Sequence, residues 1–283
     1  MKHRLQKYIP IGLVSLIALI VWLPLWMLLS GSFMPIDEIR TAFGPVLEGT
    51  KGLASWPLFP KYPTFRPYIE LLLDSPEFFA MFWNSIKLVC PILIGQIGFG
   101  MPAAWAFARF KFPFKKTLFT LYIALMLMPF QVTMVPNYLV LDKMQLLDTR
   151  WAIILPIAFS TFPVFIMYRF FKSIPEAMIE AIQIDGAGHF KTFIYIGLPL
   201  GMPGIVSALV LGFLEYWNMI EQPLTFIQNK SLWPLSLYLP NMGVDQLSVS
   251  IVASVMMIIP ALLVFLWGQN DLEAGIRVAG LKE

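Results

Sequence analysis

The chain has 283 residues, of which 58% are apolar and 13% are charged, and its formal net charge at pH 7 is +3. A soluble globular protein carries roughly a quarter charged residues, so this composition, with a mean hydropathy of +0.73, excludes an ordinary soluble fold. The small net charge gives no reason to expect a nucleic-acid partner.

Six segments of the chain are apolar over lengths that could cross a bilayer. The hydrocarbon core of a membrane is about 30 Å thick and takes roughly 20 residues of helix. The apolar runs are continuous, whereas the strands of a membrane barrel alternate, so we predict helices. The predicted fold class is an all-α membrane protein with six transmembrane helices, at about residues 9–33, 82–108, 117–141, 151–171, 192–218 and 246–270.

The positive charges predict how these helices are oriented. Lys2, Arg4 and Lys7 precede the first span, and the segments on their side of the membrane hold more Lys and Arg than those on the other side. By the positive-inside rule, both termini are expected to be cytoplasmic. The first apolar run is longer than the core of a signal peptide and is not followed by a cleavage pattern of small residues, so we expect an uncleaved span.

The longest external segment lies at about residues 34–80 and is rich in proline and aromatic residues. We expect it to lie along the outer membrane surface rather than to form a domain. Within it, the stretch from Gly44 to Lys51 partly matches a phosphate-binding loop, but Thr50 and Lys51 stand in the reverse order and no strand precedes them. We therefore expect the chain to bind no nucleotide or other cofactor.

A polar segment at about residues 173–199 separates the fourth and fifth predicted spans. Ser173 and Glu176 have the spacing of a capping box, which predicts the start of a short amphipathic helix under the bilayer. The expected apolar face of this helix consists of Ile174, Met178, Ala181 and Ile182.

Two glycines are expected to end that helix. Gly186 and Gly188 can both adopt positive φ, as helix C-termini often require. A second helix is predicted from His189 to about Leu198, and it leads through Pro199 into the fifth span.

Small residues predict where spans pack closely, because glycine and alanine allow two helix backbones to approach. In the fifth span they recur every three or four positions, at Gly201, Gly204, Ala208 and Gly212. Gly95, Gly98 and Gly100 predict a similar face in the second span. Cys90, the one cysteine, is expected to be a small buried apolar residue, and the distant His3 and His189 give no support for a metal site.

Several stretches resemble one family, the carbohydrate-importer branch of binding-protein-dependent ABC permeases, of the type represented by the six-span permease subunit of the maltose transporter. The polar segment is similar to the family's EAA loop, with Ile182 and Trp105 departing from common family residues. The stretches are Glu180-Ala181, Asp185-Gly186-Ala187, Ile196-Gly197-Leu198-Pro199, Ala104-Trp-Ala-Phe-Ala-Arg-Phe-Lys-Phe-Pro113, Met128-Pro129, Trp217-Asn218, Pro223-Leu224 and Gly275-Ile-Arg-Val-Ala-Gly-Leu-Lys282.

The resemblance implies a multi-pass protein of a bacterial or archaeal cytoplasmic membrane that performs no bond chemistry itself. Its implied partners are a second homologous permease subunit, two cytoplasmic ATPase subunits that bind ATP and Mg, an external sugar-binding protein and membrane lipid. It further implies that the EAA loop contacts the ATPases and transmits their movement, through Glu180, Ala181, Asp185, Gly186, Ala187, Leu198 and Pro199.

Two further groups of residues are candidates for function. Glu215, Trp217 and Asn218 at the end of the fifth span combine aromatic, amide and carboxylate groups that suit a sugar, although an outer aromatic belt would have the same composition. The C-terminal tail is expected to make a second contact with the ATPases, the alternative being a frayed end. Its candidate residues are Gly275, Arg277, Gly280 and Lys282.

Alternatives to sugar import remain open. An importer for another solute, such as a glycerol phosphate ester or an amino acid, would share the EAA loop. An ion channel or secondary transporter would need polar or charged groups at the middle of the membrane, where these spans have few, and would not require the EAA loop.

Overall fold

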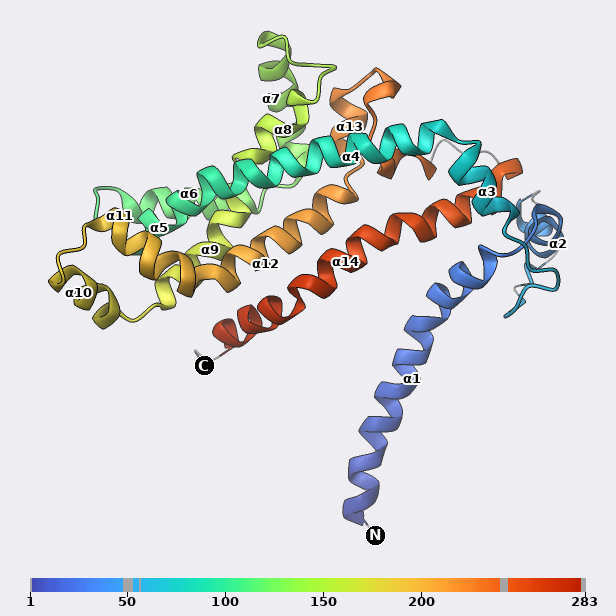
Figure 1. The fold of residues 1–283 in the computed structure, drawn as a ribbon, viewed down its shortest axis with the longest axis horizontal. Helices are drawn as coiled ribbons and strands as arrows, with labels where there is room; N and C mark the ends of the chain where they lie inside the picture. The colour runs from blue at the N-terminus through green and yellow to red at the C-terminus, as the bar shows by residue number, and fades with distance from the viewer. Residues whose placement is uncertain (1, 48–52, 56, 240–243, 281–283) are drawn as a thin grey trace. The chain divides into compact units, whose positions relative to one another are not determined.

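The computed structural model describes residues 2–47, 53–55, 57–239 and 244–280, and every regular element in these ranges is a helix (Figure 1). The chain divides into two compact units, Met1–Phe79 with Tyr238–Ile259 and Ala80–Leu237 with Pro260–Glu283. Helices α4 (Pro76–Gly95) and α14 (Leu247–Gly280) contribute residues to both units.

The described helices include five segments that are long and apolar enough to cross a membrane. They are Pro10–Gly31, Pro76–Arg109, Trp151–Ser173, His189–Trp217 and Leu247–Ala274. A sixth crossing is obtained when α6 (Lys115–Met126) and α7 (Phe130–Lys143) are counted as one bent pair. The predicted class, an all-α protein with several membrane helices, is confirmed.

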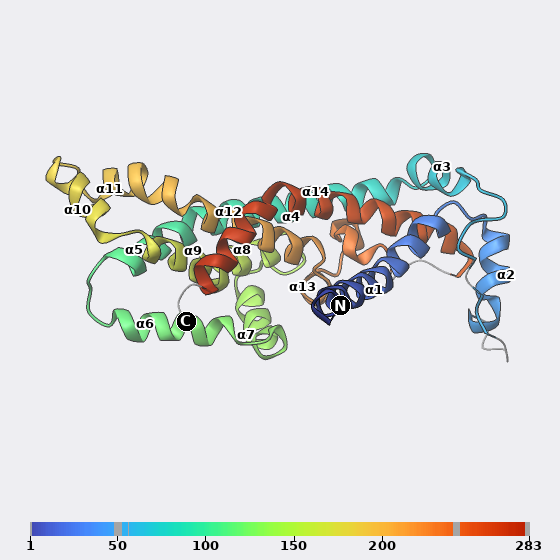
Figure 2. The same ribbon diagram turned by 90° about the horizontal axis from the view of Figure 1, so that it is seen from below.

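The third predicted span, at about residues 117–141, is not one continuous helix. The axes of α6 and α7 differ by 102°, and Figures 1 and 2 show α7 turning away from α6. Pro129 lies between them in an extended conformation, with φ −68° and ψ 153°. Proline lacks a backbone N–H and disfavours helical geometry at the residue before it, which explains why α6 ends here.

The first unit contains α1 (Lys2–Gly31), α2 (Ile36–Leu47), α3 (Arg66–Leu73) and a short turn at Val244–Gln246. Within the segment predicted at about 34–80, some described side chains pack against one another, and its location along the outer membrane surface stays a prediction. Met34 and Leu71 are fully buried, and the rings of Phe33 and Phe65 meet edge to face at 5.4 Å. Phe59, Tyr62 and Phe65 are 67%, 76% and 68% exposed, so the aromatic residues of this segment contribute only in part to this cluster.

The second unit contains the remaining helices. Two π-helical turns connect α4 to α5 and α11 to α12, so that each pair forms one long segment. In chain order the elements after α4 are η1 (Gln96–Gly100), α5 (Met101–Arg109), α6, α7, α8 (Trp151–Ala158), α9 (Thr161–Ser173), α10 (Glu176–Ile184), α11 (His189–Thr192), η2 (Phe193–Gly197), α12 (Leu198–Trp217) and α13 (Glu221–Phe226), with short turns at Lys230–Leu232 and Leu235–Leu237.

The core of the second unit forms where α9 packs against α5 and α12. The glycines of α12 make this packing possible. A Cβ atom added at Gly201 would lie 2.2 Å from the Phe171 ring, and one at Gly204 would lie 2.5 Å from the Phe170 ring. The predicted small-residue face of the fifth span is therefore a helix-packing face.

In the second span Gly95 and Gly100 pack closely as predicted, with a Cβ added at Gly100 lying 3.3 Å from Met167, whereas Gly98 and Cys90 differ from the expectation. Gly95 does pack closely, because an added Cβ would lie 2.7 Å from the Ala158 Cβ, but nothing lies within 4 Å of a Cβ added at Gly98. Cys90 is exposed rather than buried in the chain. Both residues lie on parts of the α4 segment that face away from the neighbouring helices, which spacing along one helix cannot reveal.

Candidate functional site

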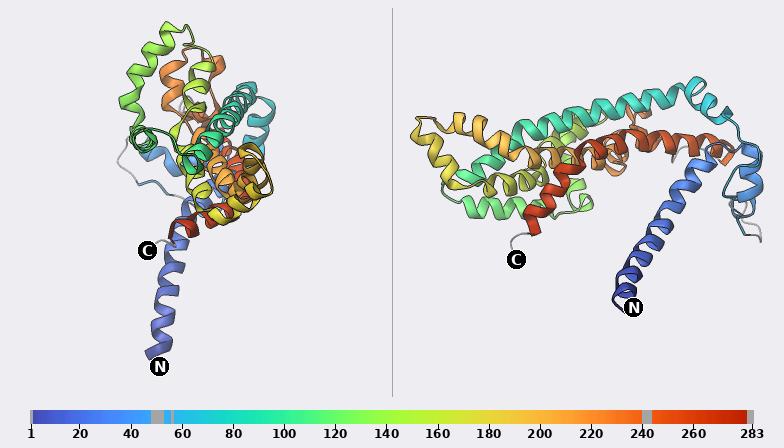
Figure 3. Two further views of the ribbon diagram at one scale, coloured as in Figure 1. Left: turned by 90° about the vertical axis from the view of Figure 1, so that its left-hand side faces the viewer. Right: turned by 60° about the horizontal axis from the view of Figure 1, so that its bottom comes forward.

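The polar segment after α9 forms a helical hairpin, which we call the coupling hairpin and define as α10, the turn at 185–188 and α11. Figure 3 shows it at one end of the second unit. The predicted capping box is absent, because α10 begins after Pro175. The Ser173 hydroxyl donates instead to the Phe170 carbonyl at 2.8 Å, and the Glu176 carboxylate binds Arg109.

Arg109, the last residue of α5, ties the coupling hairpin to the helix bundle. Its guanidinium donates to the carbonyl of Phe171 at 2.7 Å, to the carbonyl of Ile174, and to the Glu176 carboxylate at 2.9 Å. Its side chain is only 7% exposed and lies over the Trp105 ring. One cation thus connects the end of α5, the end of α9 and the first residue of α10. The bias of Lys and Arg toward the cytoplasmic side, used above to predict orientation, does not predict these specific contacts of the Arg109 guanidinium.

The turn between the two helices is a Schellman motif. Gly186 has φ +82°, its N–H donates to the carbonyl of Gln183, and the N–H of Ala187 donates to the carbonyl of Ile182. The predicted positive φ at Gly186 is confirmed. Gly188 has φ −72° and precedes α11, so the same expectation for Gly188 was wrong.

The hairpin leaves apolar side chains uncovered. Ile179 is the buried residue of α10, whereas Met178 and Ala181 of the predicted apolar face are exposed. Ile184 is 85% exposed and Phe190 is 74% exposed.

The predicted ATPase-contact residues fall into two groups. Glu180, Ala181, Asp185 and Gly186 are exposed on the hairpin, and Ala187 is partly exposed beside them. Leu198 and Pro199 lie instead in the first turn of α12, where Leu198 packs against the core of the second unit.

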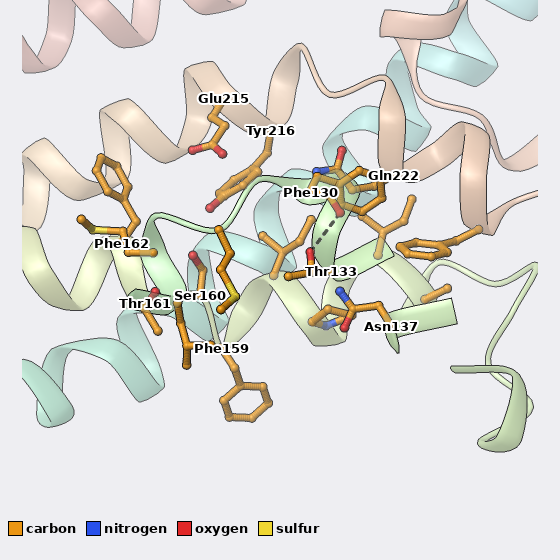
Figure 4. Close-up of a pocket in the computed structure, with 18 residues that line it drawn as sticks. Phe130, Thr133, Asn137, Phe159, Ser160, Thr161, Phe162, Glu215, Tyr216 and Gln222 are labelled. Atoms are coloured by element: carbon orange, nitrogen blue, oxygen red, sulfur yellow. Dashed lines mark hydrogen bonds between the residues drawn. The ribbon is translucent and has the colours of Figure 1, made fainter. Parts of the chain in front are cut away.

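A second feature is a cavity of about 660 Å³ within the second unit, lined by residues from α6 to α9 and from α12 and α13. Figure 4 shows Glu215 and Tyr216 on one side, and Thr133 and Asn137 on another. Its polar lining residues are Thr133, Asn137, Ser160, Thr161, Glu215, Tyr216 and Gln222. Aromatic and apolar residues, including Phe130, Phe159 and Phe162, form most of the remaining wall.

Tyr216 is held in the cavity wall by a buried amide. Gln96, in the π-helical turn η1, is 3% exposed. Its Nε2 donates to the Tyr216 hydroxyl at 2.7 Å and to the carbonyl of Ile157 at 3.0 Å. These bonds link the second span to α12 and fix the position of the phenol. Sequence reasoning missed Gln96, although a glutamine inside an apolar span is itself an unusual feature.

Of the three predicted pathway residues, only Glu215 lines this cavity. Trp217 is 1% exposed, stacks on Phe213 and meets Phe82 edge to face, so it belongs to the core. Asn218 is exposed at the end of α12, where its amide donates to the Leu214 carbonyl at 2.8 Å. In the last turn of α12, the adjacent Glu215 and Tyr216 line the cavity, and Trp217 does not.

The predicted tail begins inside a helix. α14 continues through Gly275 and Arg277 to Gly280, rather than ending with the sixth span. Lys282 lies outside the described residues.

Comparison with known proteins places this architecture in a family. Residues 96–278 match the family described as binding-protein-dependent transport system inner membrane component. A probable ABC transporter permease protein of Pyrococcus horikoshii is 33% identical, over 84% of this chain and 83% of that protein. The arabinooligosaccharides transport system permease protein AraQ of Halalkalibacterium halodurans is 25% identical, over 95% of this chain and 94% of that protein.

Among solved structures, a bacterial ABC transporter involved in the import of the acidic polysaccharide alginate has the same fold. The TM-score is 0.78 at 20% identity, over 94% of this chain and 96% of that chain. The match to the family profile extends over more than half of the chain and includes the coupling hairpin and the cavity-lining α12. The chain belongs to the binding-protein-dependent transport system inner membrane components, the membrane-spanning permease family of ABC importers.

Proposed function

We propose that this chain is a permease subunit of an ATP-driven importer for a sugar or oligosaccharide, working by alternating access in a cytoplasmic membrane. The observation that carries the proposal is the coupling hairpin, an exposed helix pair attached to the membrane helices of a chain that belongs to the importer family. The similarity to an arabinooligosaccharide permease supports the sugar as cargo.

The full importer requires other chains. The proposed partners are a second homologous permease subunit, two cytoplasmic ATPase subunits that bind ATP and Mg, and an external sugar-binding protein. This chain supplies the path and the coupling surface, and the ATPases supply the bond chemistry.

The exposed surface of the coupling hairpin suits docking into a groove. Ala181 and Gly186 present little bulk, Ile184 and Phe190 offer apolar contact, and Glu180 and Asp185 can pair with basic groups of a partner. The contacts of Arg109 with α9 and α10 provide a route by which movement of the hairpin reaches the bundle. In this arrangement Leu198 and Pro199 act at the base of α12 rather than on the docking face.

The cavity beside Tyr216 is proposed as this subunit's part of the sugar path. It combines aromatic walls with hydroxyl, amide and carboxylate groups, which together suit the two faces of a sugar ring. The C-terminal part of α14, with Gly275, Arg277 and Gly280, is proposed as a second ATPase contact.

The test is reconstitution of this chain in proteoliposomes with candidate permease, ATPase and binding-protein chains from the same organism. Labelled gluco-, xylo- and arabino-oligosaccharides serve as probes. We expect uptake of at least one of them to require both ATP and the binding protein. Uptake without ATP would indicate a channel or secondary transporter, and ATP-driven uptake of amino acids or glycerol phosphate instead would assign another cargo.

A further inference from the structure

The charged groups in the cavity wall are of one sign, negative. Among the described residues that line it, Glu215 is the one carboxylate and none is a lysine, arginine or histidine. The Glu215 carboxylate makes no hydrogen bond or ion pair with another described residue. Its oxygens are therefore available to a ligand, and any charge they carry is not neutralised by the wall.

The groups around Glu215 suit hydroxyls. Figure 4 shows Glu215 and Tyr216 extending from α12 toward the side of the cavity that holds Ser160 and Thr161. The Tyr216 oxygen already accepts a hydrogen bond from Gln96 at 2.7 Å, so its own hydrogen is directed to another acceptor. A carboxylate that accepts and hydroxyls that donate or accept match the alcohol groups of a sugar.

An acidic sugar would meet a different environment. Its carboxylate would approach Glu215 without a cation on this wall to offset it, and two like charges brought close together repel. Desolvating the sugar's charge in the cavity without a partner adds a further penalty. An uncharged sugar avoids both effects and gains hydrogen bonds to the same carboxylate.

We infer that this cavity wall selects uncharged sugars over acidic ones, and that Glu215 is the residue that sets this preference. The inference rests on the proposed function, in which the cavity is part of the sugar path. It names a substrate class that differs from the acidic polysaccharide handled by the alginate importer of the same fold.

The test measures equilibrium binding of two labelled probes to the assembled importer in detergent, without the binding protein. One probe is the neutral trisaccharide that the importer transports best, and the other is the same trisaccharide oxidised at C6 to a uronic acid. We expect the wild-type importer to bind the neutral probe at least about tenfold more tightly. Glu215→Gln should reduce this ratio several-fold, and Glu215→Lys should reverse it.

The matched control is Glu221→Gln, which removes a nearby carboxylate that does not line the cavity and binds Gln131 instead. It should leave the ratio unchanged. A wild-type ratio near one, or a ratio that does not respond to Glu215→Gln and Glu215→Lys, would overturn the charge selection. In either case ATP-driven uptake of the neutral probe would leave the proposed function standing. If the wild-type importer neither binds nor takes up any sugar, both the charge selection and the proposed function are overturned.

Discussion

Arg109 shows how much one side chain contributes to the coupling region. Three acceptors from α9, the connecting residues and α10 share a single buried guanidinium. Lysine carries the same charge, but its single ammonium group cannot reproduce the planar fork that reaches acceptors in different directions. The geometry, and not the charge alone, holds the hairpin against the bundle.

We therefore expect Arg109→Lys to weaken coupling while leaving the protein inserted. Unpaired buried carbonyls cost about 1–3 kcal/mol. The thermal unfolding midpoint of the purified importer should fall, and ATP hydrolysed per sugar transported should rise. The matched control is Lys111→Ala, which removes an exposed cation nearby. If Arg109→Lys and the wild type hydrolyse the same amount of ATP per sugar transported, Arg109 is not part of the coupling route.

Gly186 offers a second test at a single residue. A Cβ added at Gly186 would touch nothing within 4 Å, but φ +82° strains any L side chain, by about 1 kcal/mol for alanine. Gly186→Ala should loosen the hairpin and reduce co-purification of the ATPases, and the bulky Gly186→Trp should abolish transport. Gly188→Ala is the control, because Gly188 has equally open space and φ −72°. If Gly186→Trp transports normally, the hairpin is not the docking element.

At the scale of elements, α9 and α12 pack through glycines that receive phenylalanine rings. We expect Gly204→Ala to destabilise the protein by about 1–3 kcal/mol, because the new Cβ would overlap the ring and the Cβ of Phe170. Gly98→Ala should have little effect, since nothing lies within 4 Å of the added atom. Unfolding in detergent, followed by fluorescence, compares the two. Equal midpoints for both variants would contradict the described packing.

The elements also show what the sequence could and could not predict. The spacing of small residues identified the packing face of α12, because residues that recur every three or four positions lie on one side of a regular helix, and here that side is buried. The break at Pro129 was missed because hydropathy does not record backbone direction. Trp217 is a predicted pathway residue but is buried away from the cavity, because composition at the end of α12 does not reveal which side of the helix meets the cavity. The Arg109 contacts require tertiary structure, as their partners lie more than 60 residues away in sequence.

For the whole molecule, the all-α class with several membrane helices and the family could be predicted from long apolar runs and from motifs spread along the chain. The orientation in the membrane depends on a different property, the bias of Lys and Arg between the two sides. Sidedness decides whether the coupling hairpin faces the ATP-containing compartment, so it is the condition on which the proposed function depends.

We expect the hairpin to be cytoplasmic and the segment after α2 to be external. Cys90 is exposed, so the labelling background is the Cys90→Ala variant. Ser55→Cys and Gln183→Cys each place one thiol at an exposed position, the second on the coupling hairpin. In intact cells an impermeant maleimide should label the thiol at position 55 and not the one at 183, and both should react after permeabilisation. Transport by each variant confirms that it is folded, and labelling of position 183 in intact cells would reverse the predicted orientation and remove the hairpin from reach of the ATPases.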